Sequence, residues 1–420
     1  MKGRVLSVAM ILSAVFFFPA LSFSMEPHDD FSGSSIDLTK WRWGEFIREI
    51  REFGGEKKLL LARSGISPLA IGSYPNVQYN WLPFSEPSSV NSIEAAVTLL
   101  DAKINGNGSV QARLGGRWYN DGTSGGGYAG DIWAELNLLA VPGVLKGWWY
   151  VGRYTGPSDT TITQLAAGDF TQPISMGIPY TLFIGFDGAN TFTFRIGAET
   201  ITYKGPSRIG DPNNPFKGLG VRTQINDASS SSYVEATFDD VYTDGTLYDD
   251  FDDPSMMIDS SKWRVYEFVR EVAGGRLRSK SRTSTHSTSD AFVNNTLEIA
   301  YPVGINAIQA RVTPIAYNNP QGVFLVADIS GAFYNDGSGA YGRTGDVVGQ
   351  VFIGGRGSTP IAMWRVYRYL DPDGQFYELL ASGPFSTPVA LGVTYILSLY
   401  WSGNEFTFLF EGERATYRSE

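Results

Sequence analysis

The sequence predicts an all-β protein built from two tandem β-sandwich domains. Apolar and polar residues alternate with a period of two through most of the chain, as they do on a strand with one buried face. These segments are rich in Val, Ile, Thr and aromatic residues, and Gly, Asn, Asp and Pro clusters separate them. No stretch sustains apolar residues at helical spacing, and one long sequence pattern occurs twice.

The amino terminus of the 420-residue chain is typical of a secretory signal peptide. Lys2 and Arg4 precede an apolar run over residues 5–18, and residues 22–24 read Ser-Phe-Ser, a small-x-small cleavage site. The apolar run is too short to span a bilayer comfortably. We therefore expect cleavage after residues 1–24 and a secreted or periplasmic mature protein without a membrane span.

The first copy of the repeat covers residues 29–246 and is expected to form a complete sandwich. Its alternation is clearest over residues 93–99, where every second side chain is apolar. The last two strand-like segments of this copy are 218–223 and 234–243. Further alternating segments occupy 132–138, 180–186 and 191–196.

The second copy covers residues 249–420 and begins with the same Asp-Asp-Phe motif. From residue 91 onward the two copies align without a gap at an offset of 215, which becomes 214 near the end. Glu420 corresponds to Pro206, so the second sandwich is expected to lack its C-terminal strands. Matching segments include Tyr119-Asn120-Asp121-Gly122 with Tyr334-Asn335-Asp336-Gly337, and Trp149-x-Val151-x-Arg153 with Trp364-x-Val366-x-Arg368.

The composition excludes several classes of function. The chain has no cysteine, which excludes disulfides, thiol nucleophiles and cysteine-ligated metals. Its only histidines, His28 and His286, leave little room for a Ser-His-Asp triad or a histidine-based metal site. The formal net charge of −10 argues against nucleic acid and anionic membranes as partners, because both favour a basic face.

The opening and closing motifs of the first copy carry a resemblance to a known family. The opening reads Asp-Asp-Phe-Ser-Gly-Ser-Ser-Ile-Asp-x-x-Lys-Trp, and the close reads Phe-Asp-Asp-Val. Both resemble the concanavalin A-like lectin and glucanase jelly rolls, over nearly all of copy one and most of copy two. The resemblance implies that the first and last strands lie side by side. It does not imply one activity, since this fold hosts lectins, glucanases, lyases and adhesion modules.

Five residues of the first copy are candidates for glycan binding. Aromatic rings bind the apolar faces of sugars, while carboxylates and arginines bind their hydroxyl groups. Trp133 and Glu135 share one strand face, and Trp149 and Arg153 share a face of the next strand-like segment. Tyr119, which lies on a neighbouring segment, completes the set.

The second copy weakens this interpretation for some of these residues. It retains Tyr334, Trp364 and Arg368 but has Val348 and Gln350 where the first copy has tryptophan and glutamate. Residues retained in both copies also suit a structural role. The alternative is therefore that Trp149/Trp364 and Arg153/Arg368 belong to the core, with the arginines paired to Glu45/Glu267.

Catalysis is the next hypothesis, because the family contains glycosidases. Retaining hydrolysis needs two carboxylates about 5–5.5 Å apart. The Glu-x-Asp-x-x-Glu strand motif of laminarinase-type glucanases is absent, as is the Gln-Ile-His strand of alginate lyases. Glu45 and Glu49, repeated as Glu267 and Glu271, come nearest to a carboxylate pair. The alternative is that they are salt-bridged strand residues.

A structural calcium ion is a further hypothesis. Hard cations bind clusters of carboxylate and carbonyl oxygens. Asp30 of the opening motif and Asp240 of the closing motif would meet if the first and last strands pair, as the resemblance implies. The alternative is that these aspartates blunt a sheet edge and cap turns.

Together these observations predict an exported, non-catalytic carbohydrate-binding or cell-surface module whose ligand is a polysaccharide or other glycan. The alternatives are a glycoside hydrolase or polysaccharide lyase with an atypical carboxylate arrangement, and a purely structural or adhesive protein. A sandwich without its closing strands would expose unpaired backbone edges. One hypothesis is that the second copy accepts a strand from another chain. The alternatives are a truncated reading frame and closure by the 244–251 linker.

Overall fold

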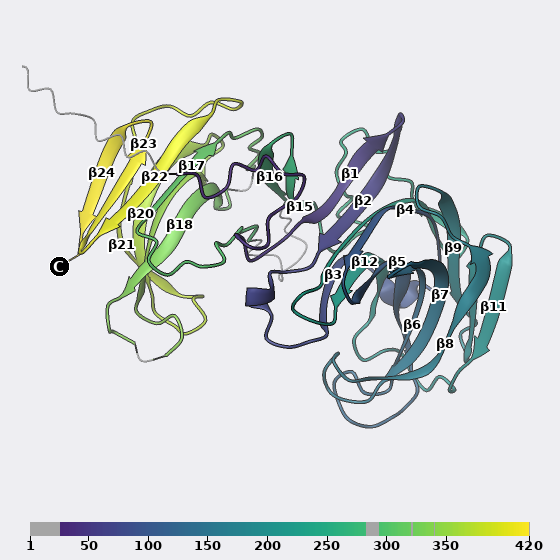
Figure 1. The fold of residues 1–420 in the computed structure, drawn as a ribbon. Helices are drawn as coiled ribbons and strands as arrows, with labels where there is room; N and C mark the ends of the chain where they lie inside the picture. The colour runs from purple at the N-terminus through teal and green to yellow at the C-terminus, as the bar shows by residue number, and fades with distance from the viewer. Residues whose placement is uncertain (1–25, 283–293, 321, 340, 420) are drawn as a thin grey trace, which may run out of the picture. The chain divides into compact units, whose positions relative to one another are not determined.

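The computed structural model divides the chain into two compact units, Met1–Tyr301 and Pro302–Glu420. Figure 1 shows their strands. The signal peptide predicted over residues 1–24 lies outside the residues that the structure describes. The described residues are 26–282, 294–320, 322–339 and 341–419.

The predicted all-β class is confirmed. Besides β-strands, the described residues form two short 3₁₀ turns, η1 (Pro68–Ala70) and η2 (Pro87–Ser89). All the strand pairs are antiparallel, as expected for a sandwich of hairpins and longer connections. In this part of the chain no helix is long and apolar enough to cross a membrane.

The first unit contains a ten-stranded sheet and a six-stranded sheet. The strands of the larger sheet are β1 (Phe46–Phe53), β2 (Glu56–Ser64), β4 (Ser92–Asn105), β9 (Pro179–Phe186), β10 (Thr191–Ile196), β11 (Glu199–Lys204), β13 (Ser231–Thr243), β14 (Thr246–Asp249), β15 (Phe268–Ala273) and β16 (Arg276–Ser281). Their order is β11-β10-β9-β4-β13-β2-β1-β15-β16, and β14 pairs with β13.

The six-stranded sheet carries the candidate site. Its strand order is β3-β12-β5-β6-β7-β8. The strands are β3 (Asn76–Pro83), β5 (Gly108–Asn120), β6 (Asp131–Val141), β7 (Val144–Tyr154), β8 (Ile162–Pro173) and β12 (Phe216–Ile225).

The core of the first unit lies between these two sheets and follows from the period-two alternation. On β4 the fully buried side chains are Ile93, Ala95, Val97 and Leu99, as the sequence predicts. On β6 every second residue from Ile132 onward joins the same apolar cluster. The intervening residues of β6 therefore lie on the outer face of the six-stranded sheet.

Strands β1 and β15 pair around a local two-fold arrangement. Ile47 lies opposite Val269, Phe46 lies opposite Arg270, and Arg48 lies opposite Phe268. The two strands come from matching positions of the repeated sequence, so the same residue types meet on both sides of the central pair. This is the self-complementary pattern of a two-fold interface, here within one chain.

The contacts around this pair also recur. Trp41 Nε1 donates to Asp29 Oδ2 at 2.7 Å, and Trp263 Nε1 donates to Asp249 Oδ2 at 2.6 Å. The matching glutamates accept hydrogen bonds from backbone amides in the same way. Glu45 accepts from the amide of Ile36, and Glu267 accepts from the amide of Ile258. The repeated tryptophans and glutamates thus fix the loop that precedes each strand.

The boundary between the two compact units does not coincide with the boundary between the two sequence copies. The sequence predicts domains over residues 29–246 and 249–420, but β15 and β16 extend the ten-stranded sheet of the first unit. Backbone hydrogen bonds between β1 and β15 hold the opening of the second copy there. The expected side-by-side placement of the first and last strands is wrong, since β13 pairs with β2, β4 and β14.

The second unit packs two four-stranded sheets around its own apolar cluster. One has the order β17-β22-β23-β24 and the other β18-β19-β20-β21. Fully buried Phe406, Phe408 and Phe410 contribute much of the core. The strands are β17 (Ala307–Val312), β18 (Leu325–Asn335), β19 (Asp346–Gly355), β20 (Ile361–Tyr369), β21 (Tyr377–Pro384), β22 (Tyr395–Ser402), β23 (Glu405–Phe410) and β24 (Glu413–Arg418).

Candidate functional site

Glu135 is the centre of a polar cluster on the outer face of the six-stranded sheet. Its Oε2 accepts hydrogen bonds from Arg113 Nη1 and from Trp133 Nε1, both at 2.9 Å. Asn137 Nδ2 lies 3.4 Å from the other carboxylate oxygen. Glu135 and Arg113 are only 4% and 3% exposed, so they form a buried ion pair. Two of the predicted glycan-binding residues, Trp133 and Glu135, therefore lie together.

Aromatic rings surround this cluster. The Arg113 guanidinium lies 4.0 Å from the centroid of the Trp81 ring and 4.9 Å from that of Tyr79. Phe216 stacks on Trp133 with centroids 6.0 Å apart and meets Trp81 edge to face. We call this surface the aromatic face, and its residues are Tyr79, Trp81, Arg113, Trp133, Glu135, Asn137, Trp148, Tyr150 and Phe216.

The aromatic face is partly open to solvent and partly buried. Tyr79 is 47% exposed, and Trp81, Trp148, Tyr150 and Phe216 are half-buried. Burial raises the pKa of Tyr150 to about 12, so its hydroxyl stays protonated at neutral pH and can donate a hydrogen bond. The open rings are thus available as a binding platform above the polar cluster.

Several buried polar atoms of this sheet have no hydrogen-bond partner among the described residues. They include Nε and Nη2 of Arg113, Oδ1 of Asn137 and Oε1 of Gln111. A buried polar atom without a partner costs about 1–3 kcal/mol. Burial also lowers the pKa of the Arg113 guanidinium, although the Glu135 carboxylate counteracts this. An ordered water, an ion or a bound ligand would satisfy these atoms.

The other three predicted residues do not face this cluster. Tyr119 is fully buried in the core, where it stacks on Phe186 with centroids 4.8 Å apart. Trp149 also packs in the core, against Phe194. The five candidates therefore do not form one site, and the alternative that placed Trp149 in the core is confirmed.

Arg153 has a different partner from the one expected. Its guanidinium binds Asp121 Oδ2 rather than Glu45, and Arg368 of the second unit binds Asp336 Oδ2 at 2.7 Å. Both aspartates belong to the repeated Asn-Asp-Gly turn. The repeated arginines therefore anchor this turn to the next strand, and the predicted pairing with Glu45 and Glu267 is wrong.

The two predicted calcium ligands have different neighbours in the structure. Asp30 Oδ1 accepts a hydrogen bond from the amide of Ser32, within an irregular opening segment. Asp240 lies at a register shift of β13, and its neighbour Asp239 pairs with Lys58 at 2.9 Å. The strand beside the end of β13 is β14, which comes from the following segment. No group of three or more acidic or histidine side chains in the described residues could hold a metal ion.

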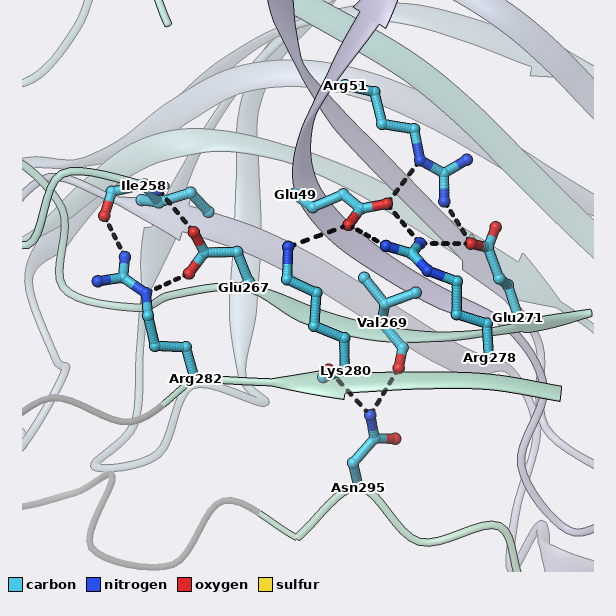
Figure 2. Close-up of polar contacts among 10 residues, drawn as sticks. All are labelled: Glu49, Arg51, Ile258, Glu267, Val269, Glu271, Arg278, Lys280, Arg282 and Asn295. Carbon is cyan, nitrogen blue, oxygen red and sulfur yellow. Dashed lines mark hydrogen bonds and ion pairs between the residues drawn. The ribbon is translucent and has the colours of Figure 1, made fainter. Parts of the chain in front are cut away.

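The repeated glutamates of β1 and β15 form a separate charge cluster, shown in Figure 2. The strand pairing brings Glu49 and Glu271 to the same pair of arginines. Arg278 Nη1 lies 2.7 Å from both carboxylates, and Arg51 also binds both. Lys280 Nζ lies 3.4 Å from Glu49. Glu49 and Glu271 are therefore salt-bridged strand residues, which is the alternative to a catalytic pair of carboxylates.

The protonation of Glu49 also opposes a catalytic role. Burial alone would raise its pKa, but hydrogen bonds and charges from Arg278 and Arg51 lower it to about 2. A general acid in glycoside hydrolysis needs a raised pKa instead. Glu49 therefore stays ionised throughout the physiological range and acts as a structural anion between β1 and β15.

This cluster predicts a specific loss of stability in acid. Because the folded pKa of Glu49 lies below its ordinary value of 4.5, its contribution is present above about pH 4.5 and is lost as the pH falls towards 2. The full loss is about 3 kcal/mol. Urea unfolding between about pH 5 and pH 3 should show a shallower pH dependence for Glu49→Gln than for the parent chain. Exposed Glu86→Gln is the control, and equal slopes for all three proteins would contradict this assignment.

Sequence reasoning missed six residues of the aromatic face, namely Arg113, Tyr79, Trp81, Trp148, Tyr150 and Phe216. The signal was present for Arg113, because it alternates with core residues on β5 just as Glu135 does on β6. The others lie on β3, β7 and β12, and β3 and β12 are distant in sequence. Strands β3 and β12 reach β5 only through the sheet order β3-β12-β5, which the sequence does not reveal.

The matching face of the second unit has different chemistry. Asp328 occupies the position of Arg113, and Gln350 that of Glu135, with Gln350 Nε2 donating to Asp328 Oδ2 at 2.6 Å. Arg365 replaces Tyr150 and covers this pair, with its guanidinium 4.8 Å from the centroids of the Phe324 and Tyr367 rings. This face lacks the tryptophans of the first unit.

No protein-family model and no curated protein matches the chain. Three of the solved structures similar to it are a glycoside hydrolase family 16 endo-glucanase from Bacteroides ovatus (13% identity, 50% of this chain, 98% of that chain, TM-score 0.27), an alginate lyase from Pseudomonas aeruginosa (12%, 50%, 99%, 0.27) and a carbohydrate-binding module from Bacillus subtilis (12%, 47%, 92%, 0.20). These proteins are of the kinds that the sequence resemblance names, but similarity at this level assigns neither a family nor an activity.

Proposed function

We propose that this chain is an exported, non-catalytic glycan-binding protein whose first unit binds a polysaccharide on the aromatic face. One observation carries the proposal, namely that the exposed ring of Tyr79 and the half-buried ring of Trp81 lie against the guanidinium of the buried Arg113–Glu135 pair. Rings such as Tyr79 and Trp148 suit the apolar faces of sugar rings. Arg113 and Asn137 keep polar atoms without a protein partner, which sugar hydroxyls or carboxylates can satisfy.

The charge of this surface favours an anionic polysaccharide. Arg117 and Arg222 lie on the same side of the sheet as Arg113, because each alternates with core residues on β5 or β12. These three arginines outweigh Glu135, although the whole chain carries a formal charge of −10. A local basic surface on an acidic protein supports recognition of carboxylate or sulfate groups.

The same geometry argues against hydrolysis on this face. Both oxygens of Glu135 accept hydrogen bonds, from Arg113, Trp133 and Asn137. Asp131, at the start of β6, binds the backbone amides of the 213–214 loop and is fully buried. Neither carboxylate has the open position that a general acid requires.

Affinity electrophoresis of the full chain in alginate, as an anionic probe, and in laminarin, as a neutral one, tests the proposal. We expect retardation by alginate that weakens with salt, and about tenfold weaker binding for Tyr79→Ala, since one ring contact contributes about 1.4 kcal/mol. Tyr341→Ala, at an 83% exposed ring of the second unit, is the matched control. Binding to laminarin alone would overturn the preference for anions, and binding to neither probe would overturn the proposal.

A further inference from the structure

Four aromatic side chains surround Arg365 of β20 in the second unit. The Arg365 guanidinium lies 4.8 Å from the ring centroids of Phe324 and Tyr367, 5.6 Å from that of Tyr377 and 5.7 Å from that of Phe352. Contacts between a cation and an aromatic ring are favourable within about 6 Å. The rings therefore hold this guanidinium in one place on the sheet β18-β19-β20-β21.

Hydrogen bonds fix one nitrogen of the guanidinium and leave the other two free. Arg365 Nε donates to Oε1 of Gln350, which lies opposite on β19, and Gln350 Nε2 donates in turn to Asp328. Among the described residues, Nη1 and Nη2 of Arg365 have no hydrogen-bond partner, and the side chain forms no ion pair. Neither nitrogen is buried. Since the next residue, Val366, points into the core, these two nitrogens lie on the outer face of the sheet.

The two units differ in how the arginine that contacts the rings is paired. In the first unit Arg113 is 3% exposed, and Glu135 neutralises its charge at 2.9 Å. Arg365 occupies the position of Tyr150, is only half-buried and binds a neutral amide. Among the described residues, its charge therefore has no carboxylate in contact. A guanidinium with two free nitrogens matches the two oxygens of a carboxylate or sulfate group.

An open aromatic ring lies beside this cation. Tyr377 of β21 is 48% exposed, and Leu379 on the same strand face is also exposed. Tyr367, whose ring centroid is 5.1 Å from that of Tyr377, is nearly buried, and burial raises the pKa of its hydroxyl group. That hydroxyl therefore stays protonated at neutral pH and can donate a hydrogen bond. An acidic sugar combines an apolar ring face with a charged group and so suits both features, whereas the side chain of an acidic peptide has the charged group only.

We propose that Arg365 and Tyr377 form a second site for an acidic sugar. Nη1 and Nη2 of Arg365 bind its carboxylate or sulfate group, and Tyr377 packs against its apolar face. The class of ligand rests on the proposed function, whereas the residues do not, because the repeat places Gln350 and Arg365 where the aromatic face has Glu135 and Tyr150. With one arginine and one open ring, this site is expected to bind more weakly than the aromatic face, with a Kd of about 1 mM for a short oligosaccharide.

Side-chain NMR of the full chain with isotopically labelled arginine tests the second site. The Nε–H signals of Arg365, Arg113 and Arg414 are assigned by their loss in Arg365→Lys, Arg113→Lys and Arg414→Lys, and the parent chain is titrated with an alginate tetrasaccharide. We expect a saturable shift of the Arg365 signal with a Kd of about 1 mM. The Arg113 signal should shift at lower concentrations. Arg414 of β24, in the other sheet of the second unit, is the matched control and should not shift.

Tyr377→Ala should raise the Kd measured at Arg365 about tenfold, because it removes one ring contact, and should leave the Kd measured at Arg113 unchanged. Tyr301→Ala, at a 64% exposed ring outside the site, is the matched control. A κ-carrageenan tetrasaccharide repeats the titration with sulfate in place of carboxylate. A shift of the Arg365 signal with either acidic sugar supports the site.

The same titration separates the second site from the proposed function. No shift of Arg365 with either acidic tetrasaccharide overturns the second site, while a shift of Arg113 leaves the proposed function standing. A shift of Arg365 without one of Arg113 supports the second site and overturns the aromatic face as the binding surface of the first unit. An equal shift of Arg365 with tetraglutamate would assign its nitrogens to acidic peptides and overturn a sugar site. An equal shift with neutral laminaritetraose would overturn the role of Arg365 in binding an anionic group.

Discussion

Trp149→Ala is expected to lower the free energy of unfolding by about 3–5 kcal/mol, whereas Trp148→Ala should lower it by about 1 kcal/mol or less. The two residues are neighbours on β7, but their side chains point to opposite faces of the six-stranded sheet. Trp149 packs in the core against Phe194, while Trp148 lies on the aromatic face beside Tyr150. The pair thus compares one side chain in two environments.

The large effect at Trp149 has a local cause. Its indole lies so close to the backbone of Gly168 that a side chain there would meet Trp149 Nε1 at 2.7 Å. Trp364 packs against Gly383 in the same way in the second unit. Removing the indole leaves a cavity that the neighbouring strand cannot fill without a shift of its backbone. The repeated Trp-x-Val-x-Arg motif therefore reflects packing and the Asn-Asp-Gly turn.

Urea unfolding followed by circular dichroism measures both variants, and affinity electrophoresis in alginate measures their binding. Trp148→Ala should weaken retardation about tenfold with little loss of stability. Trp149→Ala should lose much of its stability but should keep its retardation by alginate at concentrations of urea where it remains folded. Equal destabilisation by the two substitutions would contradict the placement of these rings on opposite faces.

The sequence predicted correctly which residues of one strand share a face. It did not predict which faces of neighbouring strands lie on the same side of the sheet. Trp133 and Glu135 share a face, and so do Trp149 and Arg153, as alternation requires. Whether these two faces are the same depends on the hairpin between β6 and β7. That hairpin places Leu136, a core residue, opposite Trp149. A change of one residue in register would have placed Trp149 on the aromatic face.

Long-range partners could not be predicted either. The alternation of β1 indicates that Glu49 is on a strand, but Arg278, its main partner, comes from the second copy of the repeat. The pairing of β1 with β15 depends on backbone hydrogen bonds between two similar hairpins, which leave no distinct motif in the sequence. The all-β class was predictable because alternation is local, whereas the order of strands in a sheet is not.

Glu135→Ala is expected to destabilise the first unit by about 3–5 kcal/mol, because it leaves the charged, buried Arg113 without a carboxylate. Adding Arg113→Met should recover much of this loss, since the charge is then gone and the apolar stem can still pack against Trp81 and Tyr79. A double-mutant cycle from urea unfolding should give a coupling of about 2 kcal/mol or more. Asp328→Ala, at the exposed position of the second unit that matches Arg113, should cost about 1 kcal/mol or less.

The double variant also separates stability from binding. A buried ion pair often contributes little net stability compared with apolar residues of similar volume. If the pair served the fold alone, Arg113→Met with Glu135→Ala should bind alginate as the parent chain does. We expect instead that the double variant folds but loses retardation, because Arg113 supplies the charge and the unpaired hydrogen-bond donors of the aromatic face. Additive losses of stability, or undiminished binding by the double variant, would contradict this role.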